Sequence, residues 1–399
     1  MHFGLRNIWG FKAFGQLGGH GVTIFFVLSG FLISYLLMAE KKETKSVNIK
    51  KFYLRRIFRI WPLYYLIIIL GLFLLPGLGI FEIPHLSKLQ DSLGLQATLF
   101  YFLFLPNIAF IYYGNVPFLD QTWSIGVEEQ FYVFWPILFV YFKTSVLKLF
   151  LFVIGILVLL KIIAYQLNVQ GVTHISNVKT ESLYLFFKLT RFSCMAIGAI
   201  AAYLFFKREI FQKNLLLFFF KNVQLLLYSQ IGYFLIFGLQ KIPLVIGFFL
   251  FGVCLFINIK KVQINAYIPS AIFIVVSICC LITGMTRQLI VIDDEVFSLL
   301  FGILILNLSN TATSIINVKN KVLLYLGKVS YGIYMYHNMV IVFSIWLITK
   351  VAKIESYSIW LYVVSILLTI FLSMLSYEFF EKKFLRLKRK YVVIKSGNN

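Results

Sequence analysis

The sequence has 399 residues, of which 60% are hydrophobic and only 13% carry a formal charge. Soluble domains typically contain about 25% charged residues, so the composition excludes an ordinary soluble protein and is typical of an integral membrane protein. In a soluble protein the net charge of +22 would suggest nucleic-acid binding. Here the basic residues lie mostly in short segments between apolar stretches, where they set membrane orientation, so we expect no nucleic-acid partner.

Twelve apolar stretches are candidate membrane helices, because about 20 apolar residues cross a bilayer core. One of them is interrupted by Pro106 and Asn107, which suggests a re-entrant or interfacial segment. We therefore predict an all-α, polytopic transmembrane bundle of about 9–11 helices without a soluble domain. The candidates are 22–38, 61–81, 94–112, 131–142, 146–164, 183–206, 223–239, 242–258, 266–285, 296–309, 329–349 and 358–380.

Two basic blocks predict the orientation of the chain. By the positive-inside rule both blocks lie in the cytoplasm, so the number of crossings between them is even and at least one of the eleven candidates there does not span. We expect a multi-pass protein of the cell membrane, with the N-terminus outside and residues 386–399 as a cytoplasmic tail. The blocks are Lys41, Lys42, Lys45, Lys50, Lys51, Arg55, Arg56 and Arg59, and Lys382, Lys383, Arg386, Lys388, Arg389, Lys390 and Lys395.

The cysteines and histidines show no metal-binding pattern. Cys194, Cys254, Cys279 and Cys280 lie inside apolar runs, where a small buried hydrophobic role is the simplest interpretation. The chain contains no HExxH or CxxC motif, so we expect neither a metal site nor a permanently bound cofactor.

Two motifs in the N-terminal part of the chain have alternative interpretations. The glycine-rich segment 18–21 leads into a helix that carries Ser29 and Gly30, where small residues favour close helix packing or allow a ligand to approach. Arg55, Arg56 and Arg59 lie at the start of the second candidate helix. They either act only as an orientation signal or bind a phosphorylated donor such as coenzyme A, because arginine pairs with phosphate in a bidentate manner.

The densest polar cluster in an apolar setting is the segment 122–136. On a helix Glu128, Tyr132 and Trp135 share one face, and Glu129 is rotated by about 100° from it. A charged group at the bilayer centre costs about 2.5–3.5 kcal/mol, so two adjacent carboxylates point to acid–base catalysis or cation pairing. The alternative is that they only stabilise a helix N-terminus.

Two further polar residues interrupt apolar stretches. Arg191 requires an aqueous cavity or a counter-charge, for which Glu181 and Glu128 are candidates. His337, on an aromatic helix after a Gly/Ser turn, is either a proton shuttle or an incidental member of an interfacial aromatic belt.

Taken in order, these blocks resemble the acyltransferase 3 family of integral-membrane acyltransferases, which includes O-antigen and other polysaccharide O-acetylases. The resemblance covers nearly the whole chain, and we expect residues 1–385 to form the membrane acyltransferase domain. The matching blocks are Gly21–Ile33, Arg55-Arg56-x-x-Arg59-Ile60-x-Pro62-x-Tyr64, Trp123-Ser124-x-x-x-Glu128-Glu129-Gln130-Phe131-Tyr132-x-x-Trp135-Pro136, Leu326-Gly327-x-x-Ser330-Tyr331-x-x-Tyr334-x-x-His337 and Glu381-Lys382-Lys383-Phe384.

The resemblance implies transfer of an acyl group, usually acetyl, from cytoplasmic acyl-CoA to a hydroxyl of a cell-surface or lipid-linked carbohydrate. An acceptor hydroxyl requires a base, and the developing oxyanion requires hydrogen-bond donors. The expected catalytic residues are His2, Glu128, Glu129, Tyr331 and His337; the expected substrate-binding residues are Trp123, Ser124, Tyr132, Arg191 and Ser29; and Arg55, Arg56 and Arg59 would hold the phosphates of the donor.

The sequence also departs from the family pattern. His2 stands at the position of the family's histidine base, but the arginine ten residues earlier and nearly all of the first helix are missing, so we expect a truncated start. Thr23 occupies a position where many members carry Asp, and Lys383 replaces a common Pro. Two other functions stay open at this point: a transporter or flippase, although no internal repeat is evident, and an inactive family member.

Overall fold

The computed structural model describes residues 12–78, 94–114, 116, 118–141, 146–170, 177–207, 291, 293–309, 320–353 and 359–393. Within these ranges all regular structure is helical, and six helical spans, one of them the interrupted span Val178–Phe206, are long and apolar enough to cross a membrane, so the predicted all-α polytopic bundle is confirmed. His2, Cys254, Cys279 and Cys280 lie outside the described residues, as do the predicted spans 223–239, 242–258 and 266–285.

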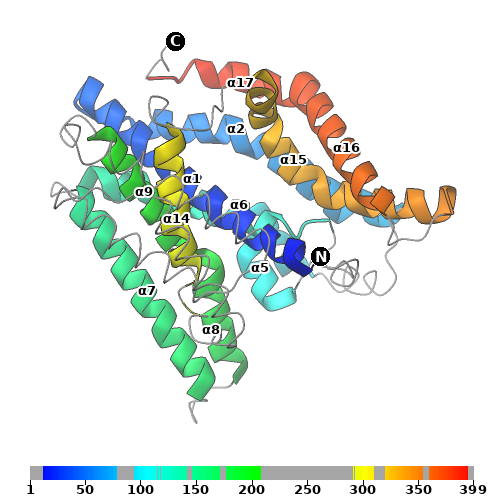
Figure 1. The fold of residues 1–399 in the computed structure, drawn as a ribbon, viewed down its shortest axis with the longest axis horizontal. Coiled ribbons are helices and arrows are strands. Elements are labelled where there is room, and N and C mark those ends of the chain that lie inside the picture. The colour runs from blue at the N-terminus through cyan, green and yellow to red at the C-terminus, as the bar shows by residue number, and fades with distance from the viewer. Residues whose placement is uncertain are drawn as a thin grey trace, which may run out of the picture.

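The helices follow one another in the order shown in Figure 1. They are α1 (Lys12–Thr44), α2 (Ile49–Ile69) with its π-helical and 3₁₀ extensions η2 (Leu70–Leu74) and η3 (Leu75–Gly77), α4 (Leu95–Phe102), α5 (Pro106–Tyr113), α6 (Thr122–Tyr141), α7 (Val146–Gln170), α8 (Asn177–Thr190), α9 (Phe192–Phe206), α14 (Asp293–Ser309), α15 (Lys321–Trp346), η5 (Leu347–Val351), α16 (Ile359–Ser376), η6 (Tyr377–Glu381) and α17 (Lys382–Arg389).

Helix α1 runs through the middle of the bundle and packs closely against α9. A Cβ atom on Gly30 would lie 1.9 Å from the carbonyl oxygen of Met195, and one on Gly198 would lie 2.0 Å from that of Val27. The two backbones are therefore in contact, which only residues without a side chain permit. This geometry agrees with the packing interpretation of Gly30.

Two predicted spans are broken. The stretch 94–112 divides into the short helices α4 and α5 at Phe104 and Leu105. Asn107 on α5 accepts a hydrogen bond from Gln130 on α6, with 2.8 Å between the Gln130 amide nitrogen and the Asn107 side-chain oxygen. The stretch 183–206 was expected to be one continuous helix, but it is interrupted at Arg191, whose backbone is left-handed with φ of 40°. The side-chain contacts of Arg191 described below account for this break.

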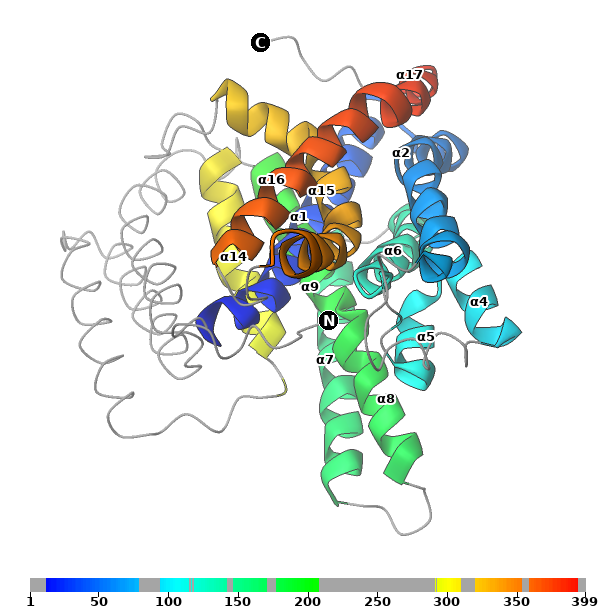
Figure 2. The same cartoon turned by 90° about the vertical axis from the view of Figure 1, so that its right-hand side faces the viewer.

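The described residues of the two basic blocks lie at one end of the bundle, here called the basic end. A nitrogen of Arg55 donates to the carbonyl oxygen of Tyr391 at 3.0 Å, and the rings of Phe58 and Tyr391 stack at 5.7 Å. Glu40, at the end of α1, accepts from Arg55 at 2.9 Å. These contacts hold α17 against α2, as Figures 1 and 2 show.

Helices α7 and α8 form an antiparallel pair that extends away from the basic end (Figures 1 and 2). The outer face of α7 exposes large apolar side chains such as Leu151, Phe152 and Leu159. Such a surface is unfavourable in water and favourable against lipid hydrocarbon, so it agrees with a membrane-embedded bundle.

Candidate active site

Glu128 and Glu129 lie on α6 at the point where it meets α1 and α2. They are only 2% and 9% exposed. The Ser29 hydroxyl on α1 donates to Glu128 Oε1, whereas the indole N–H of Trp61 on α2 donates to Glu129 Oε2 at 3.0 Å. Because adjacent residues of a helix point about 100° apart, each carboxylate contacts a different neighbouring helix. The acid pair is therefore built into the packing of three helices and does not cap a solvent-exposed helix end.

The second carboxylate oxygen of Glu129, Oε1, is buried and has no hydrogen-bond partner among the described residues. A buried, unpaired carboxylate oxygen is costly, and such groups usually have a functional reason. The Trp61 contact fixes the orientation of the carboxylate while Oε1 stays free to accept a proton.

Arg56 and Tyr132 complete the surroundings of the acid pair. The guanidinium of Arg56 lies 5.2 Å from the centre of the Tyr132 ring, a cation–π geometry. Arg56 also interacts electrostatically with both carboxylates. One half-buried cation thus lies near two buried acids, so this cluster can exchange a proton or stabilise a developing negative charge.

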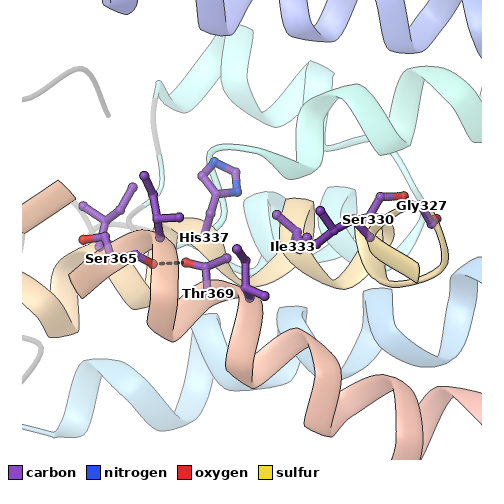
Figure 3. A pocket seen from close by; sticks show the side chains of 10 residues that line it. Gly327, Ser330, Ile333, His337, Ser365 and Thr369 are labelled. Atoms are coloured by element: carbon purple, nitrogen blue, oxygen red, sulfur yellow. Dashed lines mark hydrogen bonds between the residues drawn. The ribbon is translucent and has the colours of Figure 1, made fainter. Parts of the chain in front are cut away.

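The predicted residues on α15 reach α6 and α2 through hydroxyl groups. Tyr331 donates to the carbonyl oxygen of Ile60 at 2.9 Å. Tyr334, which the sequence did not single out as a site residue, lies 2.5 Å from Ser124 Oγ through its hydroxyl oxygen. Ser124 is therefore tied to α15. His337 Nδ1 lies 2.5 Å from the backbone oxygen of Tyr334, and His337 is one of the residues that line a cavity between α15 and α16 (Figure 3). Neither carboxylate of the acid pair lines that cavity.

Arg191 belongs to a second buried cluster. Its Nε lies 3.3 Å from Asp294 Oδ2, and a terminal nitrogen donates to Thr23 Oγ1 at 2.9 Å. The expectation that Glu181 or Glu128 supplies the counter-charge is wrong, because Glu181 is exposed on α8 and Glu128 binds Ser29. Trp123, predicted to bind substrate, faces this cluster with its ring 5.7 Å from the Arg191 guanidinium.

The same cluster contains residues that sequence reasoning missed. Lys161 on α7 lies 3.1 Å from Glu295 and 3.7 Å from Asp294, and Ser193 donates to Glu295 at 2.7 Å. The available signal was a lysine inside the apolar stretch 146–164 and three consecutive acidic residues, Asp293 to Glu295, directly before the stretch 296–309. Two cations and two carboxylates compensate one another, which is the arrangement expected of buried charges that join helices.

The three arginines predicted to hold donor phosphates have different surroundings. Arg55 is engaged by Glu40, and Arg56 lies among the aromatic rings of Phe52 and Tyr132. Arg59 is exposed and lines a cavity of about 400 Å³ at the basic end. Of these three, only Arg59 presents its charge to one of the described cavities. Among the residues that the structure describes, no group of three or more His, Cys, Asp or Glu is placed to hold a metal ion.

Comparison with known families agrees with the resemblance. The model of the acyltransferase 3 family, described as an acyltransferase domain, matches residues 1–277, more than half of the chain. The chain belongs to the acyltransferase 3 family. The acid pair of α6 and the crossing of α1 with α9 both lie within the matched region.

Proteins similar to this chain carry O-acetyltransferase names. A provisionally named O-acetyltransferase of Staphylococcus aureus is 26% identical over 91% of this chain and 52% of its own length. The peptidoglycan O-acetyltransferase of Listeria monocytogenes is 32% identical over 29% of this chain and 19% of its own length. A provisionally named peptidoglycan O-acetyltransferase of Bacillus subtilis is 33% identical over 30% of this chain and 19% of its own length. The chain therefore spans about half the length of the first of these relatives. No solved structure matches the chain.

Proposed function

We propose that this protein is a membrane O-acyltransferase that moves an acyl group, most simply acetyl, from acyl-CoA to a hydroxyl of a cell-surface or lipid-linked carbohydrate. Membership of the acyltransferase 3 family and the O-acetyltransferase names of the relatives support the reaction class. Peptidoglycan, which the names of two relatives mention, is the first acceptor to test. The basic end faces the cytoplasm in this proposal, because cytoplasmic loops are enriched in Lys and Arg.

The observation that carries the proposal is the free Oε1 of Glu129. In the transfer, the oxygen of the acceptor hydroxyl forms a bond to the acyl carbon and its proton passes to Glu129, which acts as general base. The bond from the acyl carbon to sulfur then breaks, and the coenzyme A thiolate leaves with the proton that Glu129 had accepted, which restores the carboxylate. Trp61 orients the base, and Ser29 holds the neighbouring carboxylate of Glu128 in place.

The remaining predicted residues would assist this step. The Arg56 guanidinium, which interacts with both carboxylates, would stabilise the oxyanion that develops on the acyl carbonyl. The phosphates of the donor would bind elsewhere at the basic end, beside Arg55 and Arg56. Tyr331, Tyr132 and Ser124 would shape the walls of the site through the contacts described above.

The test is acyl transfer by the intact protein in membranes. Labelled acetyl-CoA and peptidoglycan fragments are supplied to membranes that contain the wild type, Glu129→Gln or Glu378→Gln. Glu378 is an exposed glutamate bound to Lys382 near the end of α16, so Glu378→Gln is a matched control for loss of a carboxylate.

Removal of a general base is expected to lower the rate about 10²–10⁴-fold for Glu129→Gln, with the control close to wild type. Wild-type rates for Glu129→Gln would overturn the assignment of the base. Absence of labelled glycan with the wild type and every acceptor would overturn the acyltransferase proposal itself.

A further inference from the structure

A long groove runs between α15 and α16 on the surface of the bundle (Figure 3). It has a volume of about 540 Å³ and extends from Gly327 to Ile341 along α15. The helical rise between these residues is about 21 Å, which exceeds the roughly 15 Å of hydrocarbon in one leaflet. Ile366 lines the groove and is 58% exposed, so the groove opens sideways to the surface that faces lipid.

The polar groups along the groove are largely satisfied by their own helices. The Ser330 hydroxyl donates to the Gly327 oxygen at 3.0 Å, the Thr369 hydroxyl donates to the Ser365 oxygen at 2.6 Å, and His337 binds a carbonyl of α15. The Ser365 hydroxyl is the exception, since it has no partner among the described residues. The remaining lining is aliphatic, so the groove suits a hydrocarbon chain better than a chain that carries amides.

A smaller cavity of about 400 Å³ adjoins the groove at the basic end, and Gly327 lines both. Its lining contains the exposed side chains of Arg59 and Lys328 together with Tyr377, and the described residues that form it include no carboxylate. This cavity, here called the basic pocket, offers two cations to a negatively charged group. Basic pockets between membrane helices commonly bind anionic lipid headgroups.

We propose that the basic pocket and the groove together bind an anionic phospholipid, with its phosphate between Arg59 and Lys328 and one acyl chain along α15 and α16. The charge of the pocket selects the headgroup, and the groove accommodates the chain. The acyl donor fits this place less well, because the arm of coenzyme A carries two amides that the aliphatic groove would leave unpaired. The binding does not depend on the proposed acyltransferase activity.

The test measures lipid retention by the full-length protein. The protein is reconstituted with equal amounts of phosphatidylglycerol and phosphatidylcholine, and the lipids that stay bound are identified by native mass spectrometry. We expect preferential retention of phosphatidylglycerol by the wild type. Lys328→Gln removes one of the two cations, and the retained phosphatidylglycerol is expected to fall about five-fold.

A second variant tests the groove separately from the charge. A Cβ atom on Gly327 would meet no atom within 4 Å, so Gly327→Leu fits the fold and places its side chain where groove and pocket join. We expect this variant to lose the bound lipid. Gly155→Leu, at an equally open glycine on α7, and Lys321→Gln, at an exposed lysine that does not line the pocket, are the controls and are expected to retain it.

Three results would overturn the proposal. The first is equal retention of both lipids by the wild type. The second is wild-type retention of phosphatidylglycerol by Gly327→Leu. The third is displacement of the lipid by coenzyme A alone, because the pocket would then belong to the donor. Because every readout of this test is bound lipid, a negative result would not contradict the acyltransferase proposal. In the same way, absence of acyl transfer would not contradict the lipid-binding proposal.

Discussion

The contact between α1 and α9 makes a quantitative prediction for Gly30→Ala. The added Cβ would lie 1.9 Å from the Met195 oxygen and 2.6 Å and 2.7 Å from its carbonyl carbon and Cα, all of them backbone atoms. An ordinary carbon–oxygen contact is about 3.3 Å, so the two helices must separate locally by about 1.4 Å. No side-chain rotation relieves this clash.

The expected cost follows from two opposing effects. Overpacking of a well-packed interior costs about 1–3 kcal/mol, and a backbone obstacle favours the upper end of that range. Alanine regains about 0.5–1 kcal/mol over glycine inside a helix. We therefore expect the free energy of unfolding of Gly30→Ala to fall by about 2 kcal/mol.

The same displacement should reach the acid pair. Ser29 is the residue before Gly30 and binds Glu128, so movement of α1 away from α9 shifts the Ser29 hydroxyl. A misplacement of about 1 Å can lower a catalytic rate about 100-fold. We expect the acyl transfer rate of Gly30→Ala to fall by a comparable factor.

The assay is unfolding of the purified protein in detergent, followed by the transfer reaction in membranes. Gly21→Ala is the matched control, because Gly21 lies on the same helix and its added Cβ would meet no atom within 4 Å. Gly198→Ala, whose Cβ would lie 2.0 Å from the Val27 oxygen, should behave like Gly30→Ala. Equal stability of Gly30→Ala and Gly21→Ala would refute the close crossing of α1 and α9.

Two further substitutions test the buried polar contacts. Lys161→Met leaves Asp294 and Glu295 with less positive charge, so the free energy of unfolding of this variant should fall by about 3–5 kcal/mol. Adding Glu295→Gln should recover part of this loss. No recovery would argue against the pairing of Lys161 with Glu295. Trp61→Phe removes the hydrogen bond to Glu129, so the free energy of unfolding should fall by about 1–3 kcal/mol and acyl transfer should slow. Unfolding and the labelled-acetyl assay measure these two effects. An unchanged transfer rate would argue against an orienting role for Trp61.

The spacing of residues on α6 was informative about the acid pair. An angle of about 100° between adjacent helical residues predicts that Glu128 and Glu129 face different neighbours, and their partners are indeed Ser29 on α1 and Trp61 on α2. The sequence could not name Trp61, because nothing along the chain brings position 61 next to position 129. The partner of each carboxylate depends on the packing of α1, α2 and α6.

The Arg191 cluster shows even more clearly that the sequence does not identify the partner of a buried charge. An arginine in an apolar stretch requires compensation, and that requirement is visible in the sequence. The choice among possible partners is not, since Asp294 is far along the chain and Glu181 is near in sequence but exposed in space. The break between α8 and α9 follows from the same contacts, so hydropathy alone predicted one helix where there are two.

Composition and the two basic blocks by themselves determined that this is a polytopic helical membrane protein, because lipid leaves the backbone few alternatives to the helix. The ordered motifs were sufficient to recognise the acyltransferase 3 family. Only the tertiary structure decided which polar side chains meet, that Arg59 lines a cavity while Arg55 and Arg56 are held by their neighbours, and that a groove adjoins that cavity. The physical reason is that hydrophobic patterning sets which segments are buried, whereas specific pairs arise from helix contacts between residues far apart in the chain.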